Sequence, residues 1–219
     1  MKPLILLNFK SYSESVFPKS VSLVKAVEGV SEEFDVACCP ESPELLFLRE
    51  KFPKSLFFSQ NCYSTDFGAF TGHFGIKQLK ALGTNGSLIN HSERKEELDD
   101  LSRIIVEAKE EKFKLVVCVD SLKEAMHLVA FEPWAMAFEP PELIGSGNSV
   151  SSSQPDVVKK FISLLAVEAP SILPFVGAGV SSRDDLRTSL SLGAKGVLVS
   201  SAFVKSTNPR KWFKDFVSK

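Results

Sequence analysis

Short apolar runs recur along the chain, and most of them end in one or two polar residues. Eight of these runs have the length of strands and cover residues 4–8, 34–39, 55–59, 87–90, 115–119, 135–138, 172–176 and 196–199. Each run is continuously apolar rather than alternating, as is typical of parallel strands that are covered on both faces. We therefore predict eight parallel strands.

Segments with the 3.6-residue spacing of amphipathic helices lie between these runs. The clearest one carries four apolar residues on one face, Leu98, Leu101, Ile105 and Ala108. We expect Ser92 to cap this helix and Ser42 to cap another, with Pro43 at its first position. Ser182 and Asp185 predict a capping box for a third. Further helices are expected near residues 20–28, 76–82, 121–129, 157–165 and 209–217.

The alternation of strands and helices predicts the fold class. Eight units in 219 residues average about 27 residues each, enough for a strand, a helix and two short loops. No composition shift marks a boundary, so we predict a single catalytic domain over residues 1–219. The pattern favours an α/β fold, a (β/α)8 barrel, with a doubly wound open sheet as the alternative.

Composition narrows the possible partners. Lys and Arg number 26 and Asp and Glu 27, a net charge of −1, which argues against binding to nucleic acid or to an anionic membrane. An anionic ligand would need local devices such as helix N-termini. The four cysteines, without CxxC spacing, predict reduced buried thiols and no metal site. No stretch has the length of a membrane span or the features of a signal peptide, so we expect a cytoplasmic protein.

The most distinctive stretch is WAMAFEPPELIGSG, which begins at residue 134. It predicts a buried strand that ends at the carboxylate of Glu139. Pro140 and Pro141 restrict φ and exclude a helix directly after that strand. Gly145 and Gly147 permit the backbone to approach a ligand closely. These residues alone fit either an ordinary turn or a catalytic base followed by a hinged lid.

Polar residues and glycines collect at the predicted carboxyl ends of the strands. They are Asn8, Lys10, His91, Glu139, Gly177–Gly179 and Ser200–Ser201. Each has an ordinary explanation, such as a solvated lysine, an exposed histidine or a glycine turn. In a barrel, however, these strand ends meet on the one face where active sites lie. Their shared location favours a catalytic site.

Several of these segments are motifs that occur in the same order in a known family. They are NFK at 8–10, GAFTG at 68–72, INHSER at 89–94, CVD at 118–120, AFEPPELIGSG at 137–147, VGAG at 176–179 and GVLVSSAFVK at 196–205. From residue 8 to residue 205 the chain resembles the triosephosphate isomerase family. The EPPELIG form, NHSE in place of GHSE, and the short length resemble its archaeal branch.

The resemblance implies an enzyme of glycolysis and gluconeogenesis that interconverts dihydroxyacetone phosphate and D-glyceraldehyde 3-phosphate through an enediol(ate). It implies no cofactor and no metal. Glu139 matches the base and His91 the electrophile that polarises the carbonyl. Lys10 matches the cation that stabilises negative oxygen, with Asn8 positioning it and Glu93 orienting it.

The resemblance also implies where the substrate phosphate binds: Ile144, Gly145, Gly179, Ser200 and Ser201. Backbone amides at loop turns and helix N-termini suit a dianion. One departure concerns this site. Ser200-Ser201 stands where the wider family has Gly-Gly, and Ala202 follows where archaeal relatives usually have glycine. The backbone N–H groups survive these changes, and the serine hydroxyls offer additional donors.

The segment 62–74 resembles the interface loop of the family, in which a threonine like Thr71 reaches toward a neighbouring subunit's active site. We therefore expect a homodimer or homotetramer. His73 in the same loop has no assigned role. Two other functions are open: another phosphate-binding barrel enzyme, or a non-catalytic relative that serves as a binding subunit. Four catalytic positions are intact, which argues against both; they are Asn8, Lys10, His91 and Glu139.

Overall fold

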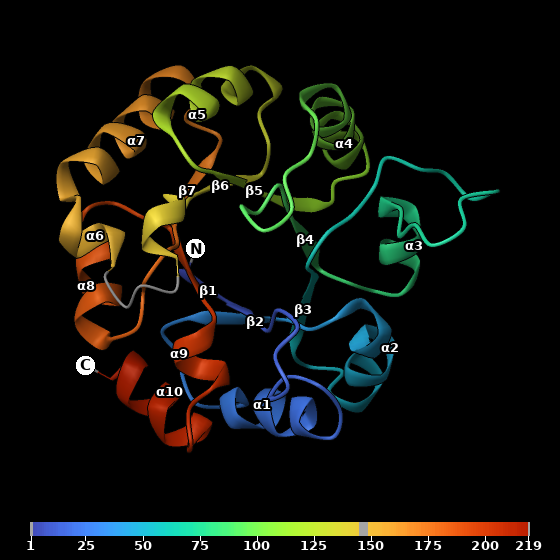
Figure 1. Ribbon diagram of the computed structural model, residues 1–219, viewed down its shortest axis with the longest axis vertical. Helices are drawn as coiled ribbons and strands as arrows, with labels where there is room; N and C mark the ends of the chain where they lie inside the picture. Colours follow the sequence, from blue (N-terminus) through green and yellow to red (C-terminus); the bar gives the residue numbers. More distant parts are fainter. Residues whose placement is uncertain (1, 145–148, 219) are drawn as a thin grey trace.

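The computed structural model describes residues 2–144 and 149–218, and its centre is a closed barrel of eight parallel strands (Figure 1). The strands are β1 (Leu4–Asn8), β2 (Asp35–Cys39), β3 (Leu56–Ser59), β4 (Gly86–Ile89), β5 (Lys114–Val119), β6 (Ala135–Phe138), β7 (Leu173–Val176) and β8 (Gly196–Val199). Each strand pairs with the next, and β8 pairs with β1, Leu4 lying opposite Gly196. The predicted (β/α)8 barrel is confirmed, and the open sheet is wrong.

Helices surround the barrel (Figure 1). The α-helices are α1 (Lys19–Val27), α2 (Ser42–Lys51), α3 (Ile76–Ala81), α4 (Leu98–Glu110), α5 (Leu122–Leu128), α6 (Val150–Ser153), α7 (Pro155–Glu168), α8 (Arg183–Ser191), α9 (Ser201–Val204) and α10 (Pro209–Val217). Short 3-10 turns η1 (Val129–Phe131) and η2 (Pro141–Leu143) flank β6. No described helix is long and apolar enough to cross a membrane.

Strand side chains divide between two hydrophobic layers. Alternate residues such as Leu4 and Leu6 belong to a cluster inside the barrel, whereas Ile5 and Leu7 pack with the helices outside. The adjacent Cys38 and Cys39 follow this rule, because Cys38 is in the outer layer and Cys39 in the inner one. The four cysteines are free and buried, as predicted.

The start of α4 differs from the prediction. The helix begins at Leu98 with Glu97 as its N-cap, and Ser92 lies in a turn well before it. Leu98 is 53% exposed, and Ile104 is buried where the predicted stripe has no residue. Residues 92–97 form a non-helical loop, in which the backbone N–H of Glu96 donates to the side chain of Asn90.

The other helix boundaries were predicted more closely. The capping box of Ser182 and Asp185 is present at the start of α8. The N-cap of α2 is Glu41 rather than Ser42, which is already helical. A 3-10 turn begins at Pro141, so the expectation that no helical structure follows Glu139 directly is wrong. A proline at a first helical position has no N–H to satisfy and a suitable φ, so Pro141 fits that turn.

Candidate active site

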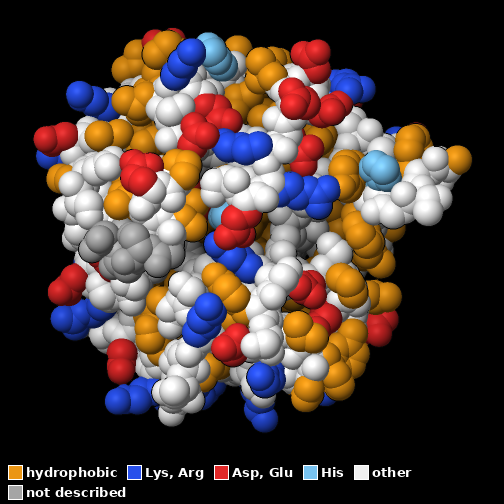
Figure 2. All heavy atoms as spheres, viewed as in Figure 1, with side chains coloured by type: hydrophobic (Ala, Val, Ile, Leu, Met, Phe, Trp, Pro, Cys, Tyr) orange, Lys and Arg blue, Asp and Glu red, His pale blue; other side chains and the backbone are white. Residues whose placement is uncertain are grey.

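The carboxyl ends of the strands surround a cleft on one face of the barrel. Acidic, basic and histidine side chains meet near the centre of this face (Figure 2). The cleft is lined by the residues that the sequence singled out, Asn8, Lys10, His91, Glu139, Ile144, Gly179, Ser200 and Ser201. Gly145 lies outside the described residues. Glu93 reaches the cleft through its contacts with Lys10 and His91.

Strand periodicity directs Glu139 into the barrel. Ala135 and Ala137 face the interior, and Glu139 continues the same alternate positions just beyond β6. Its backbone N–H donates to the carbonyl of Val119 at 2.9 Å, so the pairing of β5 and β6 extends to this residue. The side chain is buried, and its Oε2 atom has no hydrogen-bond partner among the described residues. A buried carboxylate oxygen without a partner is a strong acceptor for a ligand's proton.

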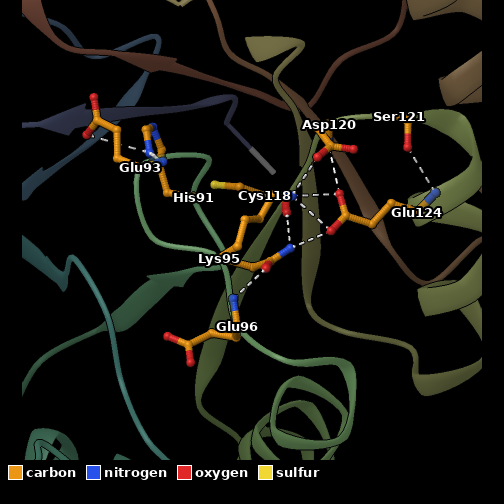
Figure 3. Close-up of polar contacts among 9 residues, drawn as sticks. His91, Glu93, Lys95, Glu96, Cys118, Asp120, Ser121 and Glu124 are labelled. Carbon is orange, nitrogen blue, oxygen red and sulfur yellow. Dashed lines mark hydrogen bonds and ion pairs between the residues drawn. The ribbon is translucent and has the colours of Figure 1, made fainter.

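His91 faces this carboxylate from the end of β4. Its Nε2 lies 3.8 Å from Oε2 of Glu139. On its other side, Nδ1 accepts a hydrogen bond from the backbone N–H of Glu93 at 3.2 Å (Figure 3). An imidazole nitrogen that accepts carries no proton, so this geometry favours the neutral tautomer with its proton on Nε2. That proton points into the cleft.

Lys10 is held in an unusual backbone conformation at the end of β1. Its φ is 47°, in the left-handed region, and its N–H donates to Oδ1 of Asn8 at 3.0 Å. The amide of Gln60 donates to the carbonyl of Lys10 at 3.1 Å. Its ammonium group lies 2.6 Å from Oε1 of Glu93. Asn8 thus supports the Lys10 backbone, while Glu93 holds the charged end of its side chain.

The opposite side of the cleft is suited to an anion. Ala178 and Gly179 both have positive φ, 63° and 71°, and form a tight turn after β7. Helix α9 begins at Ser201, and the first N–H groups of a helix lack partners within it. The hydroxyl of Ser200 is buried and has no partner among the described residues. Backbone and hydroxyl donors can therefore bind a phosphate here despite the low net charge.

Three residues that shape the site have no role assigned from the sequence. Gly177 leaves space for Glu139, because a Cβ atom there would lie 2.3 Å from its Oε1. The buried thiol of Cys118 lies against Glu139; burial, and then the charge of Glu139, raise its pKa, so it stays protonated. Gln60 braces the Lys10 loop. Gly177 and Cys118 contact Glu139 from other strands, far from it in sequence. A local sequence pattern therefore cannot predict these contacts.

Thr71 and His73 lie away from the cleft, in the long loop between β3 and α3 that projects from the barrel (Figure 1). His73 packs on Tyr63, with ring centroids 4.4 Å apart, and its Nδ1 lies 3.3 Å from the carbonyl oxygen of Thr71. The histidine without a predicted role therefore helps to shape this loop.

Fold and site together define a class of protein. The barrel places a buried carboxylate, an imidazole and a lysine on one side of a cleft, and a tight turn with backbone N–H groups on the other. Among the described residues, no group of three or more metal-ligating side chains is present. Such an arrangement can hold a small anion and move a proton to or from it, which is the chemistry of (β/α)8-barrel enzymes with acid–base sites.

Comparisons with known proteins agree with this class. The family model described as triosephosphate isomerase matches residues 3–219. A protein named triosephosphate isomerase from Methanosarcina mazei is 36% identical over 98% of this chain and 97% of its own length. Proteins of the same name from Methanobrevibacter smithii and Saccharolobus solfataricus are 34% and 33% identical, each over 99% of this chain and over 98% and 95% of their own lengths. The chain belongs to the triosephosphate isomerase family and is an isomerase.

Proposed function

We propose that this protein interconverts dihydroxyacetone phosphate and D-glyceraldehyde 3-phosphate through an enediol(ate), without a metal or cofactor. The observation that carries the proposal is the unpartnered Oε2 of Glu139, buried in the cleft and facing Nε2 of His91 at 3.8 Å. An isomerisation of this kind moves one proton between adjacent carbons while charge develops on the neighbouring oxygens. It therefore needs one base and donors for those oxygens.

In this proposal Glu139 removes the proton from one carbon and returns it to the next. Its position suits the role, because the buried Oε2 faces the cleft and has no hydrogen-bond partner among the described residues, so it is available to accept a proton. His91 donates its Nε2–H to the substrate oxygen as negative charge develops there. Lys10 stabilises the same charge and attracts the phosphate, and Asn8 and Glu93 hold it in place. No other group is required to balance the proton transfers.

The phosphate would bind on the opposite side of the cleft, to Gly179, Ser200 and Ser201. Ile144 lines the cleft beside them, and Gly145 is proposed from the family resemblance alone. The hydroxyl of Ser200 offers a donor that a glycine lacks, which supports the serine pair as a working substitute for Gly-Gly. We further propose a cytoplasmic location, which the four free buried thiols support.

The test is a coupled assay of the purified protein with D-glyceraldehyde 3-phosphate, run beside the variant Glu139→Gln. We expect kcat of the variant to fall about a thousandfold, near 4 kcal/mol at about 1.4 kcal/mol per tenfold change. Glu132→Gln, at the other end of β6, is the matched control and should keep full activity. A Glu139→Gln variant that retains more than about a tenth of wild-type kcat would contradict the assignment of the base. A folded wild-type protein without turnover would contradict the function itself.

A further inference from the structure

Asn90, which precedes His91, has features that the proposed reaction does not explain. It is 1% exposed, and its φ of 59° lies in the left-handed region. Asparagine tolerates this conformation better than most residues, but glycine tolerates it better still. A demand for positive φ alone would therefore favour glycine. The side chain of Asn90 must serve a purpose that glycine cannot.

Every polar atom of that side chain is used. Its amide group donates to the carbonyl of Cys118 on β5 at 2.9 Å and to Oε1 of Glu124 on α5 at 2.8 Å. Its carbonyl oxygen accepts from the N–H of Glu96 at 3.1 Å. Only an amide side chain supplies two donors and an acceptor at this size. Asn90 thus joins the end of β4 to a strand, a helix and the loop that follows it.

The far end of the same loop is fixed to the same carboxylate. The ammonium group of Lys95 lies 2.8 and 2.9 Å from the two oxygens of Glu124, and 3.0 Å from Asp120 (Figure 3). Glu124 also accepts the backbone N–H of Asp120 at 2.8 Å. Burial lowers the pKa of Lys95, but its hydrogen bonds to Glu124 and Asp120 outweigh burial and raise it overall, so the lysine stays charged.

Between these two attachments lie His91, which lines the cleft, and Glu93, which contacts His91 and Lys10. His91 and Glu93 occupy the middle of segment 90–96, and the ends of the segment are bound to Glu124 through Asn90 and Lys95. The backbone N–H of Glu93 is the donor that sets the tautomer of His91. A shift of the segment would therefore move the imidazole and its proton together. Displacements of about 1 Å in a catalytic group cost about a hundredfold in rate.

We propose that Asn90 and Glu124 form a clamp, the positioning device that holds His91 and Glu93 for proton transfer. Neither residue touches the substrate, so both are positioning residues and not catalytic ones. The inference rests on the proposed function, because it gives His91 a role in the reaction. A purely structural role would leave the tautomer of His91 unchanged, whereas the clamp predicts that its loss changes that tautomer.

The test uses Asn90→Gly, which keeps the left-handed backbone and removes all three side-chain hydrogen bonds. We expect kcat to fall about 10- to 100-fold and KM to change less than about threefold, because the anion-binding turn lies on other strands. Glu124→Ala removes the partner of Asn90 and should lower kcat by a similar factor. Glu124→Gln keeps an acceptor for Asn90 and should recover part of the loss. Asn85→Ala is the control: Asn85 also accepts a backbone N–H, from Phe57, but at the opposite end of β4.

A second measurement separates positioning from stability. The ring nitrogens of His91 can be followed by 15N NMR, with His73 and His127 as internal references. The wild type should show one tautomer, protonated at Nε2, and Asn90→Gly should show a mixture. The Asn85→Ala control, whose stability is compared by urea denaturation, should leave the His91 signals unchanged.

Three results would overturn the clamp. They are an Asn90→Gly variant within twofold of wild-type kcat, unchanged His91 signals in a slowed variant, or an equal loss in Asn85→Ala. If Asn90→Gly does not fold, Glu124→Ala and Glu124→Gln decide the same question. The proposed function fails separately, if the folded wild type shows no turnover, and the proposed role of His91 fails if His91→Asn keeps wild-type turnover. A dead His91→Asn variant beside a fully active Asn90→Gly refutes the clamp alone.

Discussion

At the scale of single residues, the site depends on a glycine, Gly177, whose lack of a side chain leaves room for Glu139. Gly177 comes directly after β7 and lies against Glu139. An added Cβ would meet three atoms of the Glu139 side chain within 2.6 Å. The backbone of Gly177 does not have positive φ, so the conformation itself does not require glycine. The requirement is steric and comes from the neighbouring strand. The carboxylate proposed as the base and a glycine after a different strand thus depend on each other sterically.

We predict that Gly177→Ala lowers kcat about 10- to 100-fold, because the methyl group must displace the carboxylate of Glu139. The coupled assay measures this, and thermal unfolding checks that the variant is folded. Gly196→Ala is the control, since its Cβ would lie 2.7 Å from the Leu4 carbonyl at the far end of the barrel. That variant should lose about 1–3 kcal/mol of stability from overpacking but keep its kcat. Equal kcat values for Gly177→Ala and the wild type would refute the steric account.

At the scale of elements, Asp185 joins the loop between β7 and α8 to helix α6. Its Oδ2 accepts the backbone N–H groups of Ser181 and Ser182, at 3.1 and 3.0 Å, and the Ser182 hydroxyl at 2.8 Å. Its Oδ1 accepts the hydroxyl of Ser152 on α6. The capping box predicted from sequence is therefore also a tertiary contact. It orders the loop that leads from Gly179 into α8.

This arrangement predicts how stability depends on pH. Burial raises the pKa of Asp185, but the hydrogen bonds from Ser182, Ser181 and Ser152 outweigh it and lower the pKa below its usual value of 3.8. The ionised form is therefore the one that the fold prefers. Its contribution is complete above about pH 4 and is lost as the pH falls through the lowered pKa.

We expect Asp185→Asn to reduce the free energy of unfolding at pH 7 by about 1–3 kcal/mol, measured by urea denaturation. The difference from the wild type should shrink below about pH 4, where the wild-type carboxylate takes up a proton. Asp184→Asn is the matched control, because that side chain is 89% exposed, and it should change stability little. A difference that stays constant down to about pH 2.5 would show that the ionised carboxylate is not responsible.

At the scale of the whole molecule, the projecting loop of residues 62–75 carries exposed aromatic side chains. Phe67 is 66% exposed, and Phe70 and Phe74 are also open to solvent. Apolar groups clustered on a projecting loop indicate a surface that another chain covers. This supports the proposal of a homodimer or homotetramer in which Thr71 lies at the interface.

We predict that sedimentation velocity shows a dimer or tetramer for the wild type and a smaller species for Phe67→Asp, because a charge would then be buried in the interface. The control is Val167→Asp on α7, since Val167 is 77% exposed and lies elsewhere. It should leave the assembly unchanged. A fully active wild-type monomer would exclude the interface.

The eight strand–helix units and the residues at their carboxyl ends could be predicted from the order of residues along the chain. Continuous apolar runs mark strands buried on both faces, and in parallel strands all carboxyl ends share one face. For that reason the pattern of the chain was enough to place Lys10, His91 and Glu139 together in one cleft. Local signals such as the Ser182–Asp185 box were equally reliable, because caps depend on neighbours in sequence.

Features that depend on contacts between distant segments could not be predicted from the chain and became visible only in the folded protein. Closure of the barrel rests on the pairing of β8 with β1, which no local pattern encodes. The start of α4 was predicted too early because Asn90, bonded to Glu124 34 residues away, holds residues 90–96 out of a helix. Space for Glu139 likewise comes from Gly177 on another strand. Periodicity reports burial and local conformation, whereas these features follow from which strands become neighbours.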